Sequence, residues 1–159
     1  MKPVLLLSLA LLLPAATAAA NDEPPLRKDG LWNLTIEGGA KPMTVVMCVD
    51  AASEQKTLAK ARELMAGRCS KMEMHRSANT FTQDSVCDLM GSKRTSHSVT
   101  TMVDQDTLET TTSVKYDPPK PGLGDQETRH TMKWVGPCGA DIKPGQTILN
   151  GKLITTPGN

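Results

Sequence analysis

We expect the fold to be built around the stretch Arg129–Cys138, RHTMKWVGPC. Successive side chains of a β-strand point to opposite faces, so this stretch places His130, Met132 and Trp134 on one face and polar residues on the other. A Gly-Pro turn and a cysteine end it. The chain has only two tryptophans, one tyrosine and one phenylalanine, so we expect its hydrophobic core to gather around this strand.

The same alternation recurs along most of the chain. Trp32, Leu34 and Ile36 alternate with polar residues after Gly30. Further strands are predicted at 43–49, 69–76, 80–88, 92–103, 107–116 and 127–135, mostly joined by hairpins. Between two of them, Asp50 as an N-cap and Gly67 as a stop predict one helix. The fold class is therefore mainly β, an antiparallel curved sheet or open barrel of about seven strands with one helix packed on it.

The N-terminus predicts export. Lys2, an apolar run from Val4 to Leu13, and small residues at Ala18 and Ala20 form a signal peptide over residues 1–20. The run is too short for a membrane-spanning helix, so no transmembrane anchor is expected after cleavage. Residues 21–29 would be a flexible lead-in and residues 30–159 one β-rich domain. The expected location is the periplasm, with the extracellular space as the alternative.

Charge argues against a nucleic-acid partner. Removing the leader removes Lys2 and no acidic residue, so 18 lysines and arginines become 17, against 17 aspartates and glutamates. Proteins that bind nucleic acid usually carry a basic excess or a basic stripe. The balanced mature chain has neither.

Four cysteines lie in the exported part, and an even number in an oxidising compartment predicts two disulfides. We favour Cys48–Cys69, which closes the helix onto the sheet, with Cys87–Cys138. The alternative is Cys69–Cys87 with Cys48–Cys138, because a hairpin loop centred on Ala78 would place Cys69 opposite Cys87. Zinc is disfavoured, since the chain has no C-x-x-C pair.

Several motifs resemble the family DUF3617, small exported bacterial proteins of unknown function. They are Gly30-Leu31-Trp32, Cys48-Val49-Asp50-Ala51-Ala52, Cys69, Cys87, Trp134-Val135-Gly136-Pro137-Cys138 and Lys143-Pro144-Gly145. The chain departs from the family where many members have Asp and it has Gln146, and where a hairpin glycine is usual and it has Ala78. The resemblance implies no catalytic residues.

Two kinds of binding site are candidates. The apolar face carrying Trp32, Met132 and Trp134 is a candidate for binding a small hydrophobic molecule, unless the helix simply fills it. His130 and Met132 are weak candidates for copper, because a thioether with an imidazole suits Cu(I). Methionines on an apolar strand face more often serve packing.

An enzyme is the less favoured class, because no nucleophile with an oriented base can be recognised. We predict no catalytic residue and no cofactor. The expected role is noncatalytic, with a small hydrophobic molecule or an envelope protein as partner. Threonine-rich strands at 95–101 and 107–112 would offer a polar surface for such a protein.

Overall fold

The computed structural model describes residues 23–38, 42–89, 91–119 and 124–155. The predicted signal peptide, residues 1–20, lies outside the described residues. Within the described part, one antiparallel sheet carries one helix, α1 (Ala51–Met65). Its strands are β1 (Gly30–Glu37), β2 (Met43–Val49), β3 (Cys69–Ser77), β4 (Thr80–Leu89), β5 (Ser92–Asp104), β6 (Thr107–Asp117), β7 (Gln126–Gly136), β8 (Gln146–Leu149) and β9 (Lys152–Thr155).

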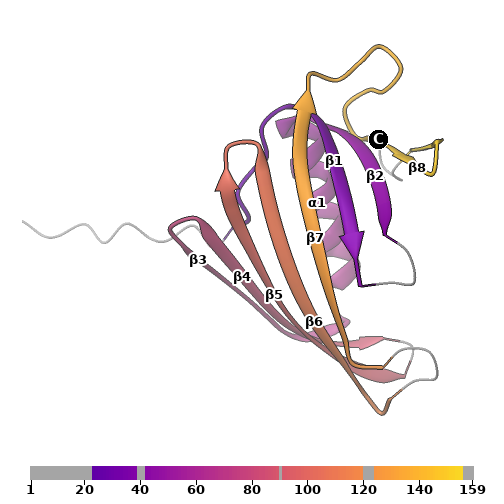
Figure 1. Ribbon diagram of the computed structural model, residues 1–159. Coiled ribbons are helices and arrows are strands. Elements are labelled where there is room, and N and C mark those ends of the chain that lie inside the picture. Colours follow the sequence, from indigo (N-terminus) through magenta and orange to yellow (C-terminus); the bar gives the residue numbers. More distant parts are fainter. Residues whose placement is uncertain (1–22, 39–41, 90, 120–123, 156–159) are drawn as a thin grey trace, which may run out of the picture.

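The strand order is β3-β4-β5-β6-β7-β1-β2-β8-β9, so β3 and β9 are the two edges of the described sheet. These edges do not pair with each other, and the sheet is open (Figure 1). The prediction of a mainly β fold with one helix is confirmed. The described sheet has nine strands, where about seven were expected, and it does not close into a barrel.

Strands β3 to β7 form a meander in chain order, and β1 joins it beside β7. Trp32 of β1 pairs with Trp134 of β7, and Leu34 pairs with Met132. Residues that lie opposite each other on antiparallel strands share a face, so the apolar alternations of the two strands reinforce one another. This register places the stretch 129–138 next to the start of the domain.

The core lies on the face of the sheet that α1 covers, here called the inner face. Trp32, at 1% exposure, packs with Val49 and Leu108. Partly buried side chains surround these three: Met47, Met102, Met132 and Trp134. The expectation that the core gathers around the tryptophans is confirmed.

Farther along the inner face, hydroxyl groups replace the apolar side chains. Ser98 pairs with Thr112 at 2.9 Å between their hydroxyl oxygens, and Thr100 pairs with Thr110 at 2.9 Å. Ser85 and Ser96 are buried and lie 2.7 Å apart. The threonine-rich strands therefore satisfy many hydroxyls within the sheet rather than presenting them all to solvent.

Helix α1 begins where the sequence predicts. Asp50 is its N-cap and forms a capping box with Ser53. Figure 1 shows α1 running behind β7, β1 and β2. Only Ser53 and Glu54 of α1 are buried, whereas Leu64 and Met65 are exposed. The helix thus covers the sheet without supplying an apolar layer to it.

The favoured disulfide pairing is wrong. The structure joins Cys48 to Cys138 and Cys69 to Cys87, not Cys48 to Cys69 and Cys87 to Cys138. Cys69 and Cys87 lie opposite each other in the β3–β4 register, as the hairpin alternative required. The favoured pairing assumed that a disulfide must fix α1, but the capping box and the segment before β1 hold that helix.

That segment, predicted as a flexible lead-in, makes several contacts with the folded domain. Asp29 Oδ1 accepts a hydrogen bond from the backbone N–H of Ala51 at 3.1 Å. Lys28 pairs with Asp106 at 2.8 Å, and Glu23 pairs with Arg62 of α1 at 3.0 Å. Residues 23–29 therefore contact both the sheet and α1. Among the residues that the structure describes, no helix is long and apolar enough to cross a membrane.

Candidate functional site

A cavity of about 320 Å³ lies between the N-terminal half of α1 and the inner face of the sheet. Its walls come from five separate parts of the chain: the segment before β1, β2, α1, β7 and the turn into β8. The lining residues are Arg27, Met47, Cys48, Val49, Ser53, Glu54, Thr57, Met132, Gly145, Gln146 and Thr147. Such a volume falls at the lower end of small-molecule sites, which span roughly 300–1,000 Å³.

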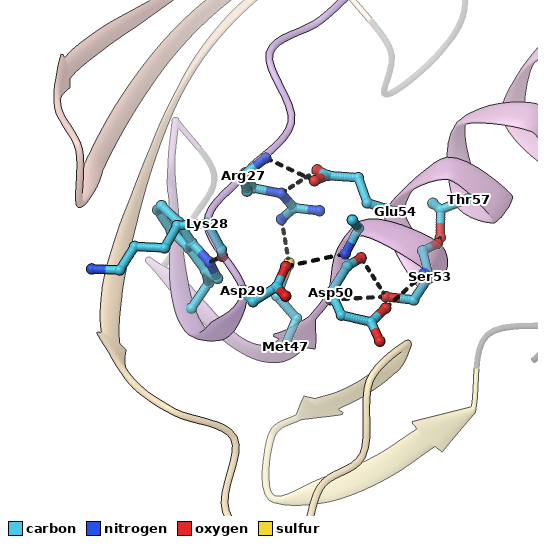
Figure 2. Close-up of polar contacts among 10 residues, drawn as sticks. Arg27, Lys28, Asp29, Met47, Asp50, Ser53, Glu54 and Thr57 are labelled. Carbon is cyan, nitrogen blue, oxygen red and sulfur yellow. Dashed lines mark hydrogen bonds and ion pairs between the residues drawn. The ribbon is translucent and has the colours of Figure 1, made fainter.

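One wall of this cavity is an ion pair between Arg27 and Glu54 (Figure 2). Arg27 Nε donates to Glu54 Oε1 at 2.6 Å, and the Arg27 backbone N–H donates to Oε2 at 2.8 Å. Their side chains are only 16% and 8% exposed. Arg27 Nη1 also lies 2.9 Å from the sulfur of Met47. The two charges compensate each other, so this wall is polar without a net charge.

The capping box fixes the adjoining wall. Asp50 Oδ1 accepts from the Ser53 N–H at 2.7 Å, and Ser53 Oγ accepts from the Asp50 N–H at 3.1 Å. The hydrogen bond from the Ser53 backbone lowers the pKa of Asp50 below its ordinary value of 3.8. Thr57 Oγ1 donates to the Ser53 carbonyl at 2.9 Å. The first turn of α1 is therefore held in place at the cavity.

The three predicted ligand-binding residues take different positions. Met132 lines the cavity. Trp32 lies in the core, and its Nε1 donates to the Lys28 carbonyl at 2.8 Å. Trp134 Nε1 donates to the Asp29 carbonyl at 3.0 Å, and the Lys28 ammonium lies 3.5 Å from the centre of its ring. The tryptophans thus support the segment that carries Arg27, and Met132 is the predicted residue that faces the cavity.

The predicted copper residues share the inner face, as the alternation requires. His130 pairs with Ile36 of β1, and Met132 pairs with Leu34. Their neighbours across β1 are thus aliphatic. Within the described residues, no group of three or more His, Cys, Asp or Glu side chains is placed to hold a metal ion. The copper site at His130 and Met132 stays a prediction.

The other histidines lie at the surface. His97 Nδ1 is 2.8 Å from Asp84 Oδ1, and both side chains are about half exposed. His97 lies on the face of the sheet opposite the core. His75 is exposed on β3.

Sequence reasoning missed Arg27 and Glu54, which define the cavity. They are 27 positions apart in the sequence, and neither is part of a motif that indicates a binding site. Arg27 falls in the polar segment that was expected to be loose. A glutamate four residues after an N-cap is unremarkable, since acidic residues are common in the first turn of a helix.

An open antiparallel sheet with one helix on its inner face, and a cavity between the two layers, defines a small two-layer β module. The chain belongs to the family DUF3617, described as proteins of unknown function, which matches residues 27–138. The resemblance in the sequence is confirmed. No curated protein and no solved structure matches the chain. Strands β8 and β9 follow the matched range.

Proposed function

We propose that the protein is a noncatalytic, exported binding module that holds a small, uncharged and largely apolar molecule between α1 and the inner face of the sheet. The proposal rests on which side chains of α1 are buried against the sheet. Helix α1 buries two polar side chains, Ser53 and Glu54, whereas Leu58 is only partly buried and Leu64 and Met65 are exposed. A helix that served only to complete the core would bury its apolar side chains instead.

The walls favour an uncharged ligand. Met47, Val49 and Met132 supply apolar surface, while the one charged pair, Arg27 and Glu54, is already neutralised. A charged ligand would lose its hydration without gaining a partner, which is costly in a partly buried site. The small volume favours a compact molecule over a long-chain lipid.

Export is supported by the two disulfides, because such bonds persist mainly in oxidising compartments. The periplasm is the proposed location. An envelope protein as partner stays a prediction, and no contact of the described residues favours it over a small molecule.

The test uses 1-N-phenylnaphthylamine, a neutral apolar fluorophore that brightens when it leaves water. Thr57 lines the cavity but is itself exposed and lies outside the core, so Thr57→Phe would fill the cavity without disturbing the core. Gln55→Phe places the same ring on the same helix away from the cavity and serves as the control. We expect at least tenfold weaker probe binding for Thr57→Phe, and wild-type binding for Gln55→Phe.

Equal binding by both variants, or no binding by the wild-type protein, would contradict the proposal. Native mass spectrometry of protein taken from its own host adds an independent measurement. We expect a retained small mass in the wild-type protein and its loss in Thr57→Phe.

A further inference from the structure

A second cavity, of about 170 Å³, lies at the other end of α1, where the helix meets the edge strand β3. It shares no lining residue with the first cavity. Three of its lining residues are methionines: Met65, Met72 and Met74. The remaining lining residues are Pro24, Leu58, Ala61, Arg62 and Gln83.

The local structure explains why these three side chains face the same cavity. Met72 and Met74 are two positions apart on β3 and therefore share a face, opposite Ser85 and Gln83 of β4. Met65 is the last residue of α1, and only three residues separate it from Cys69, where β3 begins. The chain thus brings the helix end back over the first residues of the strand.

The methionines are more exposed than packing requires. Met65 and Met72 are each 37% exposed, although they flank an apolar cavity. A methionine that only fills a core would be covered. Here the thioethers border a cavity that solvent, and therefore a dissolved ion, can reach.

The donor set of this cavity is soft and uncharged. Its lining contains no carboxylate, imidazole or thiolate, and the Gln83 amide oxygen alone cannot complete a site for Zn²⁺, Ca²⁺ or Mg²⁺. Thioether sulfur prefers Cu(I) and related soft monovalent ions. We propose that Met65, Met72 and Met74 form a three-thioether site for a soft monovalent cation of the Cu(I) and Ag(I) class. This site is distinct from the His130 and Met132 pair that the sequence suggested.

Two electrostatic features permit a cation here. Met65 lies at the C-terminal end of α1, where the helix dipole places partial negative charge. Arg62, which also lines the cavity, is paired with Glu23 at 3.0 Å, so its positive charge is offset. The local field therefore does not exclude a monovalent ion.

The neighbouring cysteine does not act as a ligand. Cys69 Sγ lies 3.9 Å from the sulfur of Met65, but Cys69 is bonded to Cys87. A thiolate would bind Cu(I) far more strongly than a thioether and would mask the site. The binding experiment therefore keeps the disulfide intact, with ascorbate as reductant for copper and a thiol assay on every sample.

The first measurement is residue-specific. Protein labelled with ¹³C in its methionine methyl groups is titrated with Ag(I), which needs no reductant, and the methyl resonances are followed by NMR. We expect the signals of Met65, Met72 and Met74 to shift together and to saturate at one equivalent. Shifts confined to Met47 or Met132, or shifts of all methionines in parallel, would overturn the proposal.

The second measurement compares matched variants by direct titration with Cu(I), kept reduced by ascorbate and followed by isothermal titration calorimetry. Met72→Leu and Met74→Leu conserve side-chain volume but remove a ligand. Met43→Leu is the control, because Met43 is also 37% exposed but lies outside the cavity. We expect at least tenfold weaker Cu(I) binding for each ligand variant and no change for the control, with thermal unfolding showing that all three are folded.

These measurements distinguish one defined three-methionine site from nonspecific binding of the ion to exposed methionines. A wild-type dissociation constant weaker than about 10 μM, about 7 kcal/mol of binding free energy, would overturn the proposal. Equal losses in Met43→Leu and Met72→Leu would do the same. Neither result bears on the apolar ligand proposed for the first cavity, because the two sites are tested with different probes and variants.

Discussion

Gly30 lies directly against the indole of Trp134, so closely that a Cβ on Gly30 would overlap the indole nitrogen and the carbonyl oxygen of Gly136. The φ angle of Gly30 is +137°, which L-residues with side chains rarely adopt. The glycine leaves room for Trp134, while Trp32, two residues later, fills the core. This contact gives a physical reason for a glycine at the start of the Gly30-Leu31-Trp32 motif.

Gly30→Ala should therefore be strongly destabilising. Backbone strain and overpacking together should cost about 3–5 kcal/mol of unfolding free energy, measured by urea denaturation. Gly139→Ala is the control, since a Cβ there meets nothing within 4 Å and should change stability little. A Gly30→Ala protein as stable as Gly139→Ala would show that the tryptophan contact does not constrain the fold.

Ala78→Gly should stabilise the protein. Ala78 has a φ of +51° in the two-residue loop between β3 and β4, at a position where hairpins favour glycine. Relief of this strain, less the extra freedom that glycine gives the unfolded chain, should add about 0.5–1 kcal/mol. Ala59→Gly within α1 should have the opposite sign, with a loss of about 1 kcal/mol. Thermal unfolding of the two variants checks both signs.

Replacing one partner of the Arg27–Glu54 pair should lower the free energy of unfolding more than replacing both. Glu54→Met leaves the Arg27 charge partly buried without its partner, and a loss of about 3 kcal/mol is expected. The double variant Arg27→Met with Glu54→Met removes both charges and should lose less. A double-mutant cycle by urea denaturation measures the coupling. Additive losses would mean that the pair is not coupled.

Acid should weaken the N-terminus of α1. The pKa of Asp50 is lowered in the folded state, chiefly by the hydrogen bond from the Ser53 N–H. A carboxyl with a lowered folded pKa stabilises the fold above its unfolded pKa, and this contribution is lost as the pH falls through the folded value.

Amide hydrogen exchange at Ser53 should therefore become less protected as the pH falls below 3.8, after correction for intrinsic exchange rates. Asp50→Asn keeps a capping oxygen but cannot titrate, so this pH dependence should disappear. If the dependence persists in the variant, another group is responsible.

The two disulfides should contribute unequally. Cys48 and Cys138 are 90 positions apart, and Cys69 and Cys87 are 18 apart. Loop-closure entropy then predicts losses of about 4.6 kcal/mol for Cys48→Ala with Cys138→Ala, and about 3.2 kcal/mol for Cys69→Ala with Cys87→Ala. Urea denaturation of the two double variants tests the order. The reverse order would show that native-state packing at Cys69 outweighs loop length.

Local signals predicted most of the fold. Seven strands follow from alternation and turn residues, and α1 begins after Asp50 as expected, because each of these features depends on neighbours in sequence. Strands β8 and β9 were missed because each has only four residues. The Asn150-Gly151 pair between them, with both φ angles positive, is a hairpin signal that could have revealed them.

Nonlocal features were harder to predict. No local pattern states that β1 inserts between β7 and β2, and this strand order settles which cysteines meet. The hairpin centred on Ala78 did indicate Cys69–Cys87, but the assumption that α1 needed a covalent tie outweighed it. The first cavity depends on the same nonlocal order, because Arg27 and Met132 come to line one cavity only after β1 pairs with β7.

The position of β1 and β2 sets the order in which a newly made chain can fold. The hairpins from β3 to β6 need only nearby residues and can form as soon as their own part of the chain is free to fold. Strand β1 must wait for β7, about a hundred residues later, with Trp32 still uncovered. A chaperone that assists this protein would therefore act on the β1–β2 hairpin, which is synthesised first but buried last.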